Sequence, residues 1–111
     1  MTGNEYQKLA MRTSRKELPW EDLLLNGALG LAGESGEVCD IIKKVIFQNH
    51  ALECLHVAKE LGDVLWYIAE TATVIGYDLD TIMQMNIDKL MKRYPEGFDS
   101  ELSQHRKQGD I

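Results

Sequence analysis

The sequence has no excess of positive charge, no cysteine motif and no long apolar run, and each absence excludes a class of protein. Its 111 residues include 18 acidic and 12 basic side chains, so no broad basic surface is available for non-specific nucleic-acid binding. Cys39 and Cys54 lie in apolar helical patterns without CxxC spacing, which predicts reduced core thiols and leaves a disulfide as the alternative. No apolar run approaches the roughly 20 residues that span a bilayer, and no signal peptide precedes the first helix. We therefore expect a soluble, cytoplasmic protein that binds neither nucleic acid nor a membrane.

No segment alternates with the period of a β-strand, and no repeat or low-complexity segment is present. Apolar residues instead recur at helical spacing, which predicts an all-α bundle of four main helices. The length allows one domain with a single core. We assign residues 1–98 to this domain and expect residues 99–111 to form a polar, frayed C-terminal tail. The four helices are predicted at about 4–17, 21–47, 51–75 and 79–93.

Two pairs of acids organise the second and third predicted helices. Glu34 and Glu37 form one pair, and Glu60 and Asp63 form the other. The i, i+3 spacing places both carboxylates of a pair on one helix face. Apolar residues surround both pairs, and a short turn joins the two helices, so we expect the four acids to face one another. Four facing carboxylates repel one another and need a compensating positive charge. Oxygen ligands alone favour Mg²⁺ or Mn²⁺ over zinc. The alternative is two solvated acid pairs, which are common on helix surfaces.

Basic and amide side chains on the second and fourth predicted helices suggest phosphate contacts. Asn86, Lys89 and Arg93 form a polar stripe on the fourth predicted helix, and arginine suits phosphate geometry. Lys44 shares the face of Glu34, two to three turns along the second helix. The alternative for these side chains is ordinary solvation of a helix surface.

Two aromatic residues are candidates for holding a nucleotide base, and one motif suggests a different metal. Tyr67 shares the helix face of the second acid pair, and Trp20 has no other assignment, although core packing is the alternative for both. Glu53 and His56 form a Glu-x-x-His motif, which di-iron carboxylate bundles use in two copies. Only one copy is present, so we favour magnesium.

Glycines at every third position from Gly27 to Gly36 predict close approach of another backbone, or a break or hinge, because each costs a helix about 1 kcal/mol relative to alanine. Ile46 and Phe47 add apolar side chains that need a partner surface. A chain this short buries only a modest core, so we expect at least a dimer.

Three blocks resemble the signature of the MazG-like, all-α nucleoside triphosphate pyrophosphohydrolases. With Tyr6, Gln7 and Thr13 they cover most of the chain up to Phe98. The blocks are GLAGESGE at residues 30–37, KELGDVLWY at 59–67 and NIDKL-x-x-RYP at 86–95.

The resemblance implies Mg²⁺-dependent cleavage of a nucleoside triphosphate to a monophosphate and pyrophosphate. It also implies a homodimer or homotetramer, because in this family packing between chains completes each helical bundle. The function would be housekeeping of the nucleotide pool, and the alternative is a regulatory module that binds nucleotide or metal without turnover. The resemblance does not identify residues that recognise the base. It implies that Glu34, Glu37, Glu60 and Asp63 are metal ligands and catalytic residues, and that Lys89, Arg93 and Asn86 contact phosphate.

Overall fold

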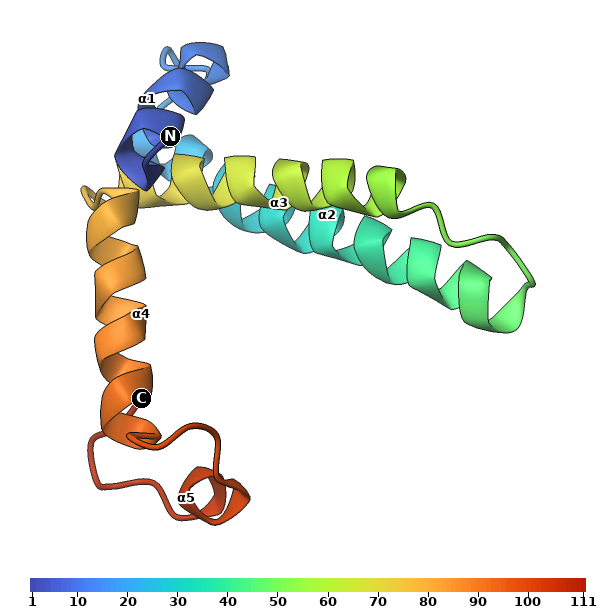
Figure 1. Ribbon diagram of the computed structural model, residues 1–111. Coiled ribbons are helices and arrows are strands. Elements are labelled where there is room, and N and C mark those ends of the chain that lie inside the picture. Colours follow the sequence, from blue (N-terminus) through green and yellow to red (C-terminus); the bar gives the residue numbers. More distant parts are fainter. The chain divides into compact units, whose positions relative to one another are not determined.

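The computed structural model describes residues 1–111 and is helical, without a β-strand (Figure 1). The all-α fold class is therefore confirmed. The chain divides into two compact units, Met1–Leu79 and Asp80–Ile111, each described by itself. The packing of all four main helices into one bundle and its completion by oligomerisation stay predictions. The elements are α1 (Gly3–Ala10), the 3₁₀ helix η1 (Met11–Thr13), α2 (Trp20–Phe47), α3 (Cys54–Val74), α4 (Leu79–Arg93) and α5 (Ser100–Gln104).

The first helix is shorter than predicted, and a distant side chain helps to fix its end. It stops at Ala10 rather than near residue 17, and the backbone of Ser14 is extended. Thr13 Oγ1 donates to the Ala10 carbonyl at 2.9 Å. The Trp66 indole N–H donates to that carbonyl at 3.0 Å and to Thr13 Oγ1 at 2.9 Å. These bonds hold the turn that ends the helix, and local periodicity contained no sign of them.

The other main helices lie close to their predicted positions. The bounds of α4 are those predicted, and α2 begins one residue early. The third helix was predicted to begin at Ala51, but α3 begins at Cys54, after a loop in which Asn49 has a positive φ of 58°. Gly76, with φ at 83°, ends α3 as expected. For these three helices the ends were predicted to within about one residue, whereas the start of α3 was missed by three residues.

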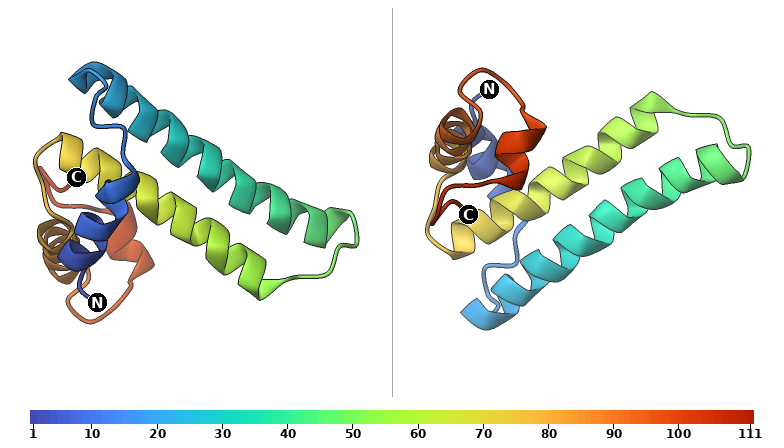
Figure 2. Two further views of the ribbon diagram at one scale, coloured as in Figure 1. Left: turned by 90° about the horizontal axis from the view of Figure 1, so that it is seen from above. Right: turned by 90° about the horizontal axis from the view of Figure 1, so that it is seen from below.

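Within the first unit, α2 and α3 form a long antiparallel hairpin, side by side in all views (Figures 1 and 2). Two glycines of α2 permit the close approach of α3. A Cβ atom at Gly27 would overlap the Thr71 hydroxyl, and one at Gly30 would overlap the ring of Tyr67. Nothing lies within 4 Å of the corresponding position at Gly33 or Gly36. The glycine ridge therefore contacts α3 along only half of its length.

Gln7 joins α1 to the end of the hairpin and is buried. Its Nε2 donates to Thr73 Oγ1 at 2.9 Å and to the Tyr77 carbonyl at 3.1 Å. Its Oε1 accepts from the Leu79 backbone N–H at 2.8 Å. All of these bonds cross between α1 and a segment about 70 residues away, so they position the N-terminal helix.

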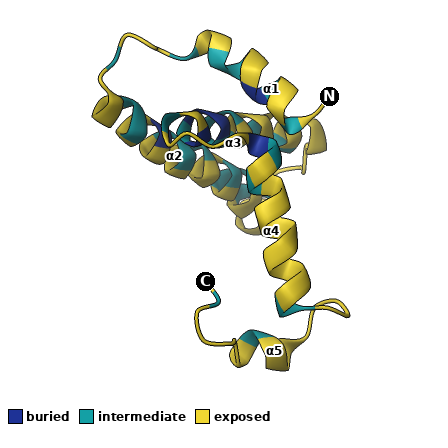
Figure 3. Ribbon diagram, turned by 90° about the vertical axis from the view of Figure 1, so that its left-hand side faces the viewer, coloured by how far each residue is buried: buried dark blue, intermediate teal, exposed yellow.

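Few side chains are fully buried in the single chain (Figure 3). The buried apolar residues are Ala69, Ala72 and Leu79, whereas Phe47 is 80% exposed. Cys39 and Cys54 are free thiols, but both are exposed, so the prediction that they lie in the core was wrong. Both lie toward the outer part of the hairpin, where only two helices pack. No helix in the structure combines the length and the apolar character of a membrane span.

The second unit contains α4 and the residues that follow it. The tail was expected to be frayed, but it forms α5, and Asp99 Oδ1 caps this helix by accepting from the N–H groups of Glu101 and Leu102 at 2.8 and 3.1 Å. Beyond α5, Asp110 pairs with Arg93 of α4. The domain boundary at residue 98 stays a prediction.

Candidate metal centre and phosphate-contact residues

Three of the four predicted acids converge between α2 and α3. Glu34 and Glu37 lie one turn apart on α2, and Glu60 lies opposite them on α3. One carboxylate oxygen from each of the three lies within 4.8 Å of the others. Glu34 and Glu60 are half-buried and Glu37 is exposed. The antiparallel hairpin therefore brings together acids that are more than twenty residues apart in sequence.

Two carboxylate oxygens in this cluster have no hydrogen-bond partner. Oε2 of Glu34 and Oε2 of Glu60 are buried and accept no bond. A buried acceptor without a partner is destabilising, and a charged one more so. The pKa of Glu34 is raised by burial and then by the negative charges of Glu37, Asp63 and Glu60. A divalent cation would satisfy the free oxygens and offset this repulsion, so the oxygen-only donor set fits Mg²⁺ or Mn²⁺.

Asp63 lies at the margin of this cluster. It is exposed and does not belong to the group of three converging carboxylates. Its charge nevertheless contributes to the raised pKa of Glu34. It also contributes to the raised pKa of Tyr6, where burial is the larger cause. Its role as a fourth metal ligand stays a prediction.

The single Glu-x-x-His motif lies beside the acid cluster. His56 Nε2 is 3.4 Å from Glu60 Oε1, so the histidine contacts the cluster from within α3. Glu53 and His56 line a small cavity of about 180 Å³ together with Lys44. Lys44 Nζ lies 2.8 Å from Asp40 Oδ2, one turn away on α2. The structure therefore pairs Lys44 with a neighbouring acid, and its contact with phosphate stays a prediction.

Both aromatic candidates have structural partners. The ring of Tyr67 packs edge-on against Trp66, with centroids 5.0 Å apart, and faces Gly30. The Trp20 indole N–H donates to the Val74 carbonyl at 3.0 Å, although half of the side chain is exposed. These contacts explain the conformations of both residues, and their roles in base recognition stay predictions.

The candidate phosphate contacts of α4 differ in their surroundings. Asn86 and Lys89 are exposed. The side chain of Arg93 is only 10% exposed and makes a two-pronged ion pair with Asp110, with bonds of 2.9 and 2.8 Å. Sequence reasoning did not identify Asp110, because the tail lacks a periodic pattern that would predict its path.

Comparison with known proteins identifies the family. The MazG nucleotide pyrophosphohydrolase domain matches residues 25–98, which is more than half of the chain. This chain belongs to the MazG family. All three converging acids and the candidate phosphate contacts of α4 lie inside the matched segment of the MazG domain.

The chain also has a relative in a bacteriophage. This chain is 34% identical over 73 residues to the "Gene 37 protein" of Mycobacterium phage L5. The match covers 62% of this chain and 64% of the relative, so it spans less than two thirds of that protein. No solved structure matches the chain.

One buried acid of the MazG domain was missed by sequence reasoning. Glu70 on α3 is 1% exposed. Its Oε1 accepts from Asn26 Nδ2 at 2.8 Å, and its Oε2 accepts from Ser14 Oγ at 3.3 Å. It is the only charged residue between Asp63 and Asp78, and this isolation among uncharged residues is a signal by which the sequence could have identified it. Its neutral donors on two other segments indicate a structural role in joining α2, α3 and the residues before α2.

Proposed function

We propose that this MazG domain is a Mg²⁺-dependent nucleoside triphosphate pyrophosphohydrolase. It converts a ribo- or deoxyribonucleoside triphosphate to the monophosphate and pyrophosphate, as housekeeping of the cytoplasmic nucleotide pool. The observation that supports this most is the cluster of Glu34, Glu37 and Glu60, with its two unpartnered buried oxygens, inside the segment that matches the family.

The acids have two roles in this proposal. Glu34, Glu37, Glu60 and Asp63 hold Mg²⁺, for which Mn²⁺ can substitute. When bound, the ion supplies charge neutralisation on the phosphates and an acidified water. A carboxylate oxygen that no protein group bonds is also available as a base, so one of the glutamates takes the proton of the attacking water.

Other side chains bind the substrate. Lys89 and Arg93 contact the phosphate chain, with Asn86 and Lys44 as further contacts. Tyr67 and Trp20 contact the nucleoside.

Exposed apolar side chains support an oligomer, either a homodimer or a homotetramer. Phe47 and Ile46 lie at the end of α2, and Leu55 lies at the start of α3, all strongly exposed in the single chain. Large contiguous apolar patches on a soluble protein usually mark an interaction surface. A second copy of the chain is the partner that covers them in this proposal.

Product analysis tests the proposed reaction. A panel of ordinary and modified nucleoside triphosphates is incubated with the protein and Mg²⁺, and the products are separated by chromatography. We expect equal amounts of monophosphate and pyrophosphate, and no turnover when EDTA replaces Mg²⁺. A diphosphate with free phosphate would instead identify an ordinary phosphatase. Tight nucleotide binding without turnover would identify a regulatory module.

Two matched variants on α3 and its cap test the site itself. Glu60→Gln retains the shape of a cluster member without its charge, and we expect turnover to fall at least about a hundredfold at saturating Mg²⁺. Glu53→Gln makes the same change at the N-cap of α3, about two turns before Glu60, and should have little effect. Equal losses in both variants would favour the Glu-x-x-His motif and contradict the assignment.

A further inference from the structure

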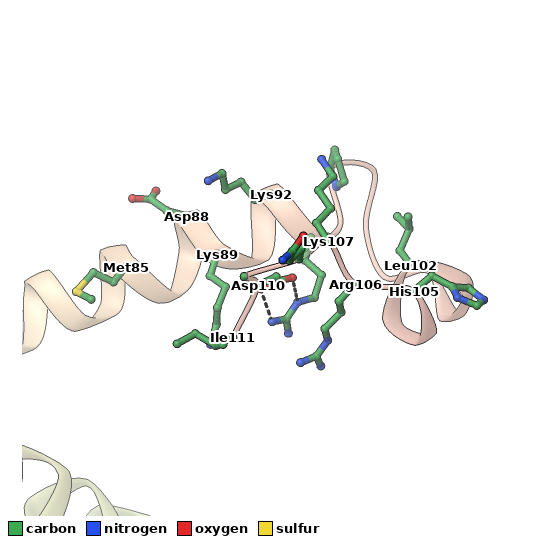
Figure 4. A pocket seen from close by; sticks show the side chains of 14 residues that line it. Met85, Asp88, Lys89, Lys92, Leu102, His105, Arg106, Lys107, Asp110 and Ile111 are labelled. Atoms are coloured by element: carbon green, nitrogen blue, oxygen red, sulfur yellow. Dashed lines mark hydrogen bonds and ion pairs between the residues drawn. The ribbon is translucent and has the colours of Figure 1, made fainter.

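A cavity of about 630 Å³ lies within the second unit, between α4 and the tail (Figure 4). Its lining is strongly basic, although the whole chain carries a net charge of −6. A local concentration of cations in an acidic protein attracts anionic ligands. The basic side chains that line it are Lys89, Lys92 and Arg93 on α4 and Arg106 and Lys107 on the tail.

An acidic side chain of the protein itself already pairs with Arg93, the most buried of these basic side chains. Arg93 Nε donates to Asp110 Oδ2 at 2.9 Å, and Arg93 Nη2 donates to Asp110 Oδ1 at 2.8 Å. A guanidinium uses the same pair of parallel bonds for a carboxylate and for a phosphate. Asp110 therefore holds the position that two phosphate oxygens would take on Arg93.

The charges around this position exceed what one carboxylate neutralises. The pKa of Asp110 is lowered, first by its hydrogen bond with Arg93 and further by the positive charges of Arg106 and Lys89. In Figure 4 the Arg106 side chain lies beside the bonded pair. Two acidic side chains, Asp88 and Asp110, thus line the cavity together with five basic ones. A pyrophosphate or triphosphate chain carries more negative charge and offers more acceptor oxygens, so it matches this surplus better.

We infer that the cavity between α4 and the tail is a polyphosphate-binding site that Asp110 keeps closed until a phosphate chain displaces it from Arg93. The tail has two roles: Arg106 and Lys107 add contacts to the bound anion, and Asp110 competes with it. The inference rests on the proposed function for its physiological ligand, the phosphate chain of a nucleotide. A competitor within the chain lowers the apparent affinity in proportion to the fraction of molecules whose Arg93 is free.

The test is the binding of inorganic pyrophosphate to the full chain, measured by titration calorimetry at fixed ionic strength in EDTA. EDTA removes divalent ions, so pyrophosphate cannot bind through a metal at the acid cluster. If Asp110 is displaced from only about one molecule in ten, Asp110→Asn should bind pyrophosphate about tenfold more tightly than the unmodified protein. In an Arg93→Ala background, the same change should give no gain.

Asp88→Asn is the matched control. Asp88 lines the same cavity and carries the same charge. It accepts from Gln84 Nε2 at 2.8 Å instead of from Arg93, and in Figure 4 it extends from the other side of α4. Its replacement should change the affinity by less than about twofold, because Asp88 is exposed, where solvent and salt screen its charge, and it does not compete for Arg93. If both variants gained equally in affinity for pyrophosphate, the gain in Asp110→Asn would come from its general change in charge, and the inference would be overturned.

A second measurement needs no variant. The side-chain Nε–H signal of Arg93 in a ¹⁵N NMR spectrum of the unmodified protein should shift as pyrophosphate replaces Asp110. An unchanged signal at saturating pyrophosphate, or equal affinities of Asp110→Asn and the unmodified protein, would overturn the inference. Neither result depends on hydrolysis. If the protein hydrolyses triphosphates but Asp110→Asn and the unmodified protein bind pyrophosphate equally, only the competition by Asp110 is refuted. If Asp110→Asn binds pyrophosphate more tightly but no triphosphate is hydrolysed, only the proposed function is refuted.

Discussion

Replacing Gly30 by alanine should destabilise the hairpin, although alanine is the better helix former. A Cβ atom at this position would overlap the Cδ1, Cε1 and Cζ atoms of the Tyr67 ring. The ring has little room to withdraw, because Trp66 packs against it with an interplanar angle of 83°. The two helices must therefore separate, or the ring must adopt a strained rotamer.

The magnitude follows from two opposing effects. Alanine gains about 1 kcal/mol of helix propensity over glycine. Inserting a methyl group into a closely packed contact costs about 1–3 kcal/mol. Because a Cβ at Gly30 would overlap three atoms of the Tyr67 ring, the cost should lie near the upper end of this range. The net loss should then be about 2 kcal/mol, which lowers the melting temperature by roughly 10 °C in a domain of this size.

Gly36→Ala is the control on the same helix. Nothing lies within 4 Å of its Cβ position, so the propensity gain remains and the variant should be about 0.5–1 kcal/mol more stable. Both variants are compared with the unmodified protein by urea denaturation at one protein concentration. In a Tyr67→Ala background the penalty at Gly30 should disappear, which assigns it to the ring contact. The reasoning is refuted if Gly30→Ala is as stable as Gly36→Ala, or if both lose stability equally, which would place another chain over Gly36.

Two further predictions concern charge and assembly. In metal-free protein the folded state raises the pKa of Glu34 above 4.5, so the folded state loses stability as pH rises from about 4.5 through that raised value. Glu34→Gln should remove this loss. The free energy of unfolding of the variant should exceed that of the unmodified protein by an amount that grows toward neutral pH and shrinks with saturating Mg²⁺. A difference that does not depend on pH would contradict this prediction. If a second copy covers the exposed apolar residues around Phe47, the melting temperature should rise with protein concentration from about 1 to 100 µM. A constant melting temperature together with a monomeric mass by light scattering would exclude this.

The sequence predicted those features that depend on local spacing. The bounds of α4 and the end of α3 follow from apolar periodicity and from Gly76, which adopts the positive φ that a helix stop favours. The convergence of Glu34 and Glu37 with Glu60 also follows from spacing, because one turn per pair and a short connection bring these acids together. Whether the three bind a metal is still to be tested.

The remaining features depend on contacts that periodicity does not contain. The first helix ends at Ala10 partly because Trp66, 56 residues away, donates to its last carbonyl. The pairing of Arg93 with Asp110 requires the tail to turn back along α4, which involves positive φ angles at Gly97 and Gly109. Both outcomes depend on where a distant segment lies in space, and no pattern within either segment encodes it.

The position of Gln7 has a consequence for synthesis on the ribosome. Its hydrogen-bond partners follow it by 66, 70 and 72 residues, so the polypeptide must be made as far as Leu79 before all three bonds can form. The hairpin of α2 and α3 has shorter-range contacts and can pair first, since contacts between nearby residues form faster. Helix α1 therefore leaves the ribosome before the hairpin, but it is among the last of these elements to reach its native place.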